Sequence, residues 1–244
     1  GDGGLVEVSG KGYLNYRGSA DLTASAGRFG TLLLDPTNIL IEASAPDING
    51  DGTSGDDLGP GGIDFADPGV NSRITAGALV TQLASGNVEL QANNNVNVNA
   101  EVNSGTASNL TLRGGGLVII NAPVTVGGDL TLSASDLGGT RDLAGAVTVN
   151  AALTVGGTLT LTNNGAPGTG VHSVGANLTA DTLTFVGDVA RTAGSATWTL
   201  SGDSTVGSNI TGDFPFTKAG AGALILAGTL NASTVTINGG TLQA

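Results

Sequence analysis

The residues with the clearest metal-binding spacing lie between positions 43 and 73, in a stretch rich in Asp, Asn, Gly and Pro. Oxygen-bearing side chains recur there at alternate positions, and Gly52 follows the third of them. This is the spacing of the first half of an EF-hand calcium loop, in which alternate oxygen ligands converge on one ion and the glycine permits a sharp turn. The candidate calcium ligands are Asp47, Asn49, Asp51 and Thr53.

The second half of this motif departs from the EF-hand pattern. The acid expected at the twelfth position is replaced by Leu58, and no helical pattern flanks the segment. An EF-hand loop has both of these features. Two interpretations therefore stay open for this stretch: one bound calcium ion, or an acidic turn without a metal. Calcium is the only cofactor that the sequence suggests.

The residue types that enzymes use as nucleophiles and bases are few in this chain. Cysteine is absent, and the single histidine, His172, has no Cys, His or acidic partner at metal-binding spacing. We therefore expect His172 to be a surface residue. The glycines at 114–116 lack the Lys-Ser/Thr pair and the helix that follow a phosphate-binding loop. These observations predict that the protein is not an enzyme.

A polysaccharide lyase or glycosidase is the strongest enzymatic alternative. Such an enzyme needs acids gathered on one face, with a basic residue for a lyase or as a pair for hydrolysis. In this chain the acids gather mainly between 47 and 67, and the arginines are dispersed. The arginines in question are Arg73, Arg113, Arg141 and Arg191.

The composition narrows the classes of partner. The 244 residues include 8 Lys and Arg against 20 Asp and Glu, a formal net charge of −12. Nucleic acids and anionic membrane surfaces attract basic clusters, and this sequence has none. No apolar run is long enough to cross a membrane. Without Cys there is no disulfide, and without Met we expect the chain to be a fragment of a longer or processed protein.

The elements that must position any site are very short strands. Between positions 109 and 161 apolar residues alternate with Thr or another residue, and Gly, Asn, Ser, Ala and Asp separate the runs. Alternation with a period of two places the apolar residues on one face of each strand and the threonines on the other. The predicted strands are 109–112, 117–120, 124–126, 130–132, 147–149, 153–155 and 159–161.

This strand pattern repeats. Residues 121–132 match residues 150–161 almost position for position, which is typical of stacked units that cannot bury their apolar faces singly. We predict an all-β fold, a parallel β-helix forming a single domain over residues 1–244, with residues 43–73 as a loop projecting from it. At roughly 20–25 residues per coil the chain makes about ten to twelve coils and a rod about 50 Å long.

Two further groups of residues have structural interpretations. The asparagines between 93 and 103 suit stacked amide ladders at the corners of the coils, with solvated turns as the alternative. Trp198, the only tryptophan, fits a place in the core or at a coil cap better than a sugar-binding platform.

The first hundred residues resemble a known family. The strings GGLVEVSGKG at 3–12, GRFGTLLLDPTNILIE at 27–42 and residues 74–104 are similar to the repeat region of filamentous-haemagglutinin-like exoproteins, which are bacterial adhesins of two-partner secretion. The resemblance implies a right-handed parallel β-helix. It also implies export through an outer-membrane secretion partner, a location at the bacterial cell surface or outside the cell, and a role in adhesion.

The C-terminal residues resemble a second family. Lys218-Ala-Gly-Ala-Gly-Ala-Leu224 and Gly239-Gly-Thr-Leu242 are similar to the autotransporter-associated β-strand repeat. This resemblance again implies an exported β-helix. We therefore expect a non-enzymatic shaft or adhesive segment of a surface fibre, with self-association, either end to end or lateral, and host-cell or surface glycans as further partners.

Two alternatives for the function stay open. One is a β-helix that binds or degrades polysaccharides. The other is an ice-binding solenoid, because the outward threonines 158, 160 and 162 form the kind of array that such proteins present. Threonine is also an ordinary residue on the outer face of a strand.

The candidate calcium loop predicts a stabilising effect of calcium. A ligand that binds only the folded state raises the free energy of unfolding, so millimolar calcium should raise the melting temperature. The substitution Asp51→Ala should abolish this shift. An unchanged melting temperature in calcium, or an equal shift in the D51A variant, would identify the stretch as an acidic turn without a metal.

Overall fold

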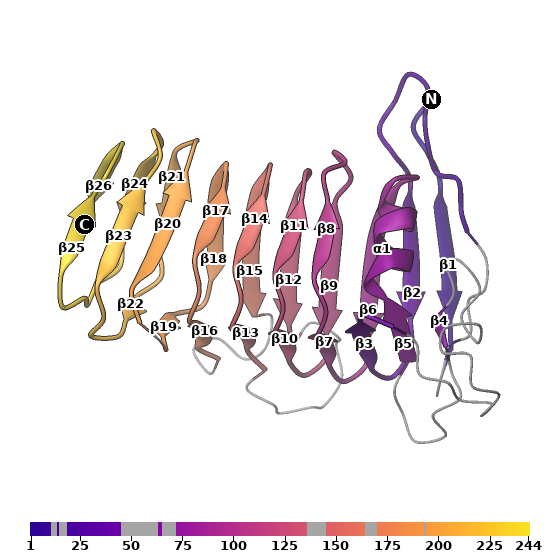
Figure 1. Cartoon of the computed structure of the whole chain (residues 1–244), viewed down its shortest axis with the longest axis horizontal. Helices are drawn as coiled ribbons and strands as arrows, with labels where there is room; N and C mark the ends of the chain where they lie inside the picture. The colour runs from indigo at the N-terminus through magenta and orange to yellow at the C-terminus, as the bar shows by residue number, and fades with distance from the viewer. Residues whose placement is uncertain are drawn as a thin grey trace.

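The computed structural model describes residues 1–10, 14, 19–44, 63–64, 72–135, 145–163, 170–192 and 194–244. These residues form a coil that advances along one axis, from the N-terminal end to the C-terminal end (Figure 1). Most turns of the coil contribute a strand to each of three walls in the same order, as β9, β10 and β11 show before β12 returns to the first wall.

The first wall contains ten strands in two successive sheets, seven in one and three in the other. Their number matches about ten coils, within the expected range. They are β1 (Leu5–Ser9), β2 (Thr31–Asp35), β6 (Asn87–Ala92), β9 (Leu110–Gly114), β12 (Leu130–Ala134), β15 (Thr158–Asn163), β18 (Thr182–Val186), β21 (Ser204–Val206), β24 (Ala223–Leu226) and β26 (Thr241–Gln243).

The other two walls run alongside it. The second contains β4 (Ile63–Asp64), β5 (Ser72–Thr75), β3 (Ile39–Glu42), β7 (Val96–Val98), β10 (Val118–Ile120), β13 (Val147–Val149), β16 (His172–Val174), β19 (Val189–Arg191) and β22 (Ile210–Thr211). The third contains β8 (Val102–Ser104), β11 (Val124–Val126), β14 (Leu153–Val155), β17 (Leu178–Ala180), β20 (Ala196–Leu200), β23 (Phe216–Ala219) and β25 (Val235–Ile237). The expected all-β parallel β-helix is confirmed.

The register of the strands sets the length of the coils. Val88, Leu110 and Leu130 are partners in three successive coils, so these coils hold 22 and 20 residues. Each paired strand is parallel to its neighbour, apart from β4, which pairs antiparallel with β5. Because the register preserves the phase of the alternation, apolar side chains lie above one another and form a continuous buried column.

The predicted strands between 109 and 161 are confirmed to within one or two residues at each end. Their burial alternates as expected. Leu110 and Leu112 are buried and Thr111 between them is not. The core is built from Leu, Val, Ile and Ala along most of its length, so the hydrophobic effect acts along the whole axis.

The repeated Gly-Gly pairs lie where successive coils approach most closely. A Cβ atom added to Gly156 would lie 2.3 Å from the carbonyl oxygen of Gly127 in the coil before it. Real Cβ atoms do not approach an oxygen so closely, so a side chain here would push the two coils apart. The glycines shared by the two sequence repeats are therefore a steric requirement of the stacking.

The corners of the coil carry hydrogen-bonded ladders, as expected for the asparagine-rich coil. Asn121 donates from its amide to Oδ1 of Asn99 (3.0 Å), and Asn150 donates in the same way to Asn121 (2.9 Å). At another corner the side-chain oxygen of Asn109 accepts the backbone N–H of Asp129 (2.8 Å), whose carboxylate accepts that of Thr158 (2.8 Å). These bonds tie each coil to the next beyond the strands themselves.

The structure contains one helix, α1 (Ala76–Leu83), among the described residues, and the sequence pattern did not predict it. The side chain of Thr75 caps its first turn by accepting the backbone N–H of Ala78 (3.1 Å). The helix packs on β8, the first strand of the third wall. It therefore covers a sheet edge that would otherwise expose unpaired backbone groups.

The predicted loop at 43–73 is only partly described. Within it, β4 and the first residues of β5 belong to the second wall, where Ile39 of β3 is the register partner of Ser72. The second wall therefore continues past β3 into β5 and β4, whose residues the sequence pattern did not assign to strands. The rest of the predicted loop lies outside the described residues.

The uniform register predicts that one coil is removable. Deletion of residues 110–129 joins Asn109 to Leu130, which is the register partner of Leu110, so the buried columns keep their phase. The variant should therefore unfold cooperatively and retain its strand signal in circular dichroism. Deletion of 110–120, about half a coil, should abolish the cooperative transition. If both variants unfold alike, the coils are not equivalent units.

Candidate functional site

The predicted calcium ligands Asp47, Asn49, Asp51 and Thr53 lie outside the described residues. Among the residues that are described, no three or more His, Cys, Asp or Glu side chains form a group able to hold a metal ion. The calcium site therefore stays a prediction.

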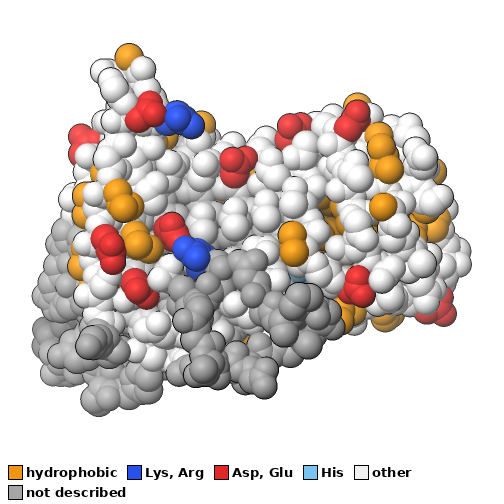
Figure 2. All heavy atoms as spheres, turned by 180° about the vertical axis from the view of Figure 1, so that it is seen from behind, with side chains coloured by type: hydrophobic (Ala, Val, Ile, Leu, Met, Phe, Trp, Pro, Cys, Tyr) orange, Lys and Arg blue, Asp and Glu red, His pale blue; other side chains and the backbone are white. Residues whose placement is uncertain are grey.

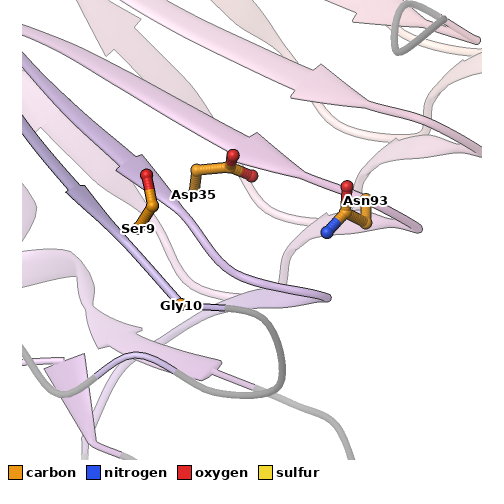
Figure 3. Close-up of a pocket in the computed structure, with 4 residues that line it drawn as sticks. All are labelled: Ser9, Gly10, Asp35 and Asn93. Atoms are coloured by element: carbon orange, nitrogen blue, oxygen red, sulfur yellow. The ribbon is translucent and has the colours of Figure 1, made fainter.

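A hollow of about 160 Å³ lies at the outside of the first wall, where its first coils turn the corner (Figure 3). Its lining residues are Ser9 and Gly10 at the end of β1, Asp35 at the end of β2, and Asn93 just after β6. Ser9 and Asp35 are register partners in adjacent strands. The hollow is therefore built from the same corner of three successive coils.

Backbone hydrogen bonds hold this corner in place. The N–H of Gly10 donates to the carbonyl of Asp35 (3.0 Å), and the N–H of Asn93 donates to the carbonyl of Pro36 (3.1 Å). Pro36 lacks an N–H and fixes φ, so it ends β2 at Asp35 as the sequence indicates. The side chain of Asp35 remains on the outer face, between those of Ser9 and Asn93 (Figure 3).

Asp35 is the group with the most unusual electrostatics in this hollow. Its Oδ1 atom is buried and has no hydrogen-bond partner among the described residues. Burial raises the pKa of the Asp35 carboxyl, because it penalises the charged form. A hydrogen bond from Gln91 acts in the opposite direction, the negative charge of Glu7 adds to the increase, and the positive charge of Arg113 partly offsets it.

Two neighbouring acids already have partners. Glu89 forms an ion pair with Arg113 in the next coil, with 2.8 Å between Oε1 and Nη1. Glu7 accepts a hydrogen bond from the hydroxyl of Ser9 (2.7 Å). Asp35 differs from both in having a buried oxygen without a partner among the described residues. The arrangement offers several hydrogen-bond acceptors at one corner of the coil.

Acidic side chains are dispersed over the surface of the coils. Figure 2 shows acidic side chains spread over one face of the molecule, with hydrophobic side chains mostly scattered between them. Basic side chains are sparse among the described atoms of this face and form no patch there. This agrees with the net charge of −12 and gives no support to a nucleic-acid interface.

The expectation for His172 is wrong, because its side chain is fully buried. It occupies an inward position of the second wall, beside β13 and β19, where the neighbouring coils place valines. Its Nδ1 accepts the backbone N–H of Val147 (3.3 Å), so its Nε2–H donates to the carbonyl of Val186 (2.9 Å). Both ring nitrogens are therefore committed to the fold and neither can serve as a catalytic base.

The signal for this burial was present in the sequence. Val174 is an obvious inward residue, and His172 lies two positions before it on the same face of β16. Burial lowers the pKa of His172, and the hydrogen bond to Val186 only partly opposes this. The folded protein therefore favours the neutral ring.

Trp198 lies in the core, which is one of the two places expected for it. It forms edge-to-face contacts with Phe185 and Phe216, with ring centroids 5.5 Å and 5.2 Å away. Its register partner Lys218 is also buried, and its ammonium donates to the carbonyls of Ala219 (2.7 Å) and Gly220 (3.1 Å). The lysine of the C-terminal repeat is thus a structural group within the coil.

Comparison with protein-family models, with curated protein sequences and with solved structures gives no match for this chain. Within the described residues, no helix is both long and apolar enough to span a bilayer.

The burial of His172 predicts a loss of stability in mild acid. The unfolded state titrates near its ordinary pKa of about 6.5, whereas the folded state resists protonation, so the unfolded state takes up the proton first. Stability from this group is complete above pH about 6.5 and falls as the pH drops below it, by up to about 1.4 kcal/mol per pH unit. Urea unfolding between pH 7.5 and 5.5 measures the effect.

The matched control is His172→Gln, which keeps an amide donor and acceptor but does not titrate in this range. Its free energy of unfolding should change less with pH than that of the unmodified protein. An equal dependence in both proteins would assign the effect to other groups.

Proposed function

We propose that this chain is a structural shaft or adhesive segment of a secreted bacterial surface fibre, without enzymatic activity. The observation that supports this proposal most directly is the uniform stack of about ten coils with continuous buried columns. Each coil pairs its backbone with the next, so such a structure gains length without needing a thicker core. A long and stiff object is what holding a binding tip away from a cell requires.

The end coils support the proposed self-association. At the C-terminal end, Val235 and Ile237 of β25 are the register partners of buried residues in β23, yet they are 47% and 51% exposed. At the other end, Val6 of β1 is 37% exposed although its partner Leu32 is buried. Exposed side chains in these positions are suited to further stacking, either by coils of the same chain or by another chain.

The proposed fibre segment is exported from the cell. The resemblance to two-partner-secreted exoproteins supports a location outside the cell or on the bacterial surface, with an outer-membrane protein as the proposed secretion partner and host-cell or surface glycans as proposed ligands. The absence of cysteine means that folding after export depends on no disulfide. Progressive stacking onto an already folded coil needs no other driving force than the burial of the next apolar set.

The enzymatic alternative receives little support from the described residues. His172 is buried with both ring nitrogens bonded to the backbone, and Asp35 lies on the outer face of the first wall. A catalytic triad built on the single histidine would need these groups to converge. The described residues therefore give no support to a hydrolase that uses His172 as its base.

The ice-binding alternative depends on regular rows of threonine. One outward row does contain Thr111, Thr131, Thr160 and Thr184 in successive coils. The rows beside it are mixed, because Asn109 and Asp129 precede Thr158 in one of them. A regular two-row array is thus limited to β15 and β18, which weakens this alternative.

Surface labelling tests the proposed function. An antibody against the folded segment should label intact cells that produce the protein, and treatment of those cells with external protease should remove the label. A cytoplasmic protein measured in the same cells is the control for intactness. Label confined to the cytoplasm, or cleavage of a polysaccharide by the purified segment, would contradict the proposal.

A further inference from the structure

The corner hollow of Ser9, Gly10, Asp35 and Asn93 is lined mainly by hydrogen-bond acceptors. The hydroxyl of Ser9 already donates its hydrogen to Glu7 (2.7 Å), so its oxygen can only accept a further hydrogen bond. Oδ1 of Asp35 is a buried acceptor without a partner among the described residues. Asn93 adds a side-chain carbonyl oxygen. Three acceptors and the amide N–H donors of Asn93 therefore line one hollow.

A primary ammonium group matches this set, since it has three donors and no acceptor. Leaving a buried acceptor unpaired destabilises the folded protein, and a bound donor would remove this penalty. Hydrogen bonds between an ammonium and a carboxylate are also stronger than those between neutral groups. The unpartnered oxygen of Asp35 is thus best satisfied by a cationic donor.

The charges around the hollow favour the same ligand. Glu7 and Glu89 add negative charge near Asp35, and Arg113 offsets part of it through its ion pair with Glu89. An anionic ligand such as a uronic acid or a sulfated sugar would be repelled by this corner. A divalent metal is not supported, because the described residues contain no group of three acids or histidines close enough to hold one.

The size of the hollow limits the ligand to a small one. Its volume of about 160 Å³ exceeds the roughly 30 Å³ share of one water molecule, and it is below the range of about 300–1,000 Å³ for drug-sized ligands. One ring with a polar substituent is of the appropriate size. Gly10 supplies no side chain to fill the space.

We propose that this hollow binds the protonated amine of a hexosamine residue, with Asp35, Ser9 and Asn93 as the three acceptors. This site would supply a ligand for the adhesive role in the proposed function, and the inference rests on that function. A shaft that is exported and folded but does not bind amino sugars would refute the site alone, so the two proposals fail separately.

The test is an NMR titration of the ¹⁵N-labelled protein with a glucosamine trimer. The backbone amide signals of Gly10 and Asn93 should shift in a saturable way. The N-acetylglucosamine trimer, which has the same rings without the positive charge, should bind at least tenfold more weakly. Equal binding of the two trimers would overturn the proposal.

Two variants make the test specific. Asp35→Asn keeps the shape of the side chain and removes its charge, and it should weaken the glucosamine trimer at least tenfold. Glu101→Gln is the matched control, because Glu101 is an exposed acid on another part of the coil and its loss changes the net charge equally. If both variants bind alike, the attraction is a general effect of net charge and the site is refuted.

A third variant removes the ammonium group that the sequence places next to Gly10. Lys11 follows Gly10 in the sequence, and its side chain carries a primary ammonium. If the Lys11→Gln variant binds the glucosamine trimer more tightly than the unmodified protein does, the lysine ammonium competes with the sugar amine for the same acceptors. That result would support the assignment of these acceptors. Absence of binding in both proteins, or binding of a lysine peptide in preference to the amino sugar, would overturn the assignment to a hexosamine.

Discussion

The structure depends on parallel backbone pairing between coils that keep the same phase. Strands of two to six residues are too short to form stable hairpins, and they persist because most of them pair on both sides. Pairing in phase places Leu above Leu and Val above Val, so the core becomes a column rather than a cluster. The glycines at the corners and the amide ladders follow from the same requirement, since successive coils must approach to the distance of a hydrogen bond.

Much of this architecture was predictable because its signal is local. The alternation in residues such as Leu130-Thr-Leu132 fixes both the strand and its buried face, and the repeat at 150–161 identifies the stacking. The helix α1 was not predicted. Its eight residues carry no long amphipathic pattern, and its place is set by the edge of β8 that it covers. Burial of His172 was missed because a polar residue was interpreted by type rather than by its phase relative to Val174.

The corner hollow could not be predicted from the sequence for a different reason. Ser9, Asp35 and Asn93 are far apart in the chain, and the pairing of β2 with β6 across more than fifty residues brings them together. Pro36 ends β2 for a local reason, yet the lack of a partner for Oδ1 of Asp35 is a property of the folded surroundings. Local pattern fixes the faces of strands, whereas a site at a corner depends on the registers of several coils.

The direction of the hydrogen bonds has a mechanical consequence. The strands run around the axis, so the bonds between coils lie nearly along it, and tension on the two ends pulls each coil straight away from its neighbour. The coils then bear the load in series and detach singly from an end. A coil of 20 residues, such as the one between Leu110 and Leu130, would release about 70 Å of extended chain. A stack built in this way lengthens stepwise under force and dissipates energy at each step.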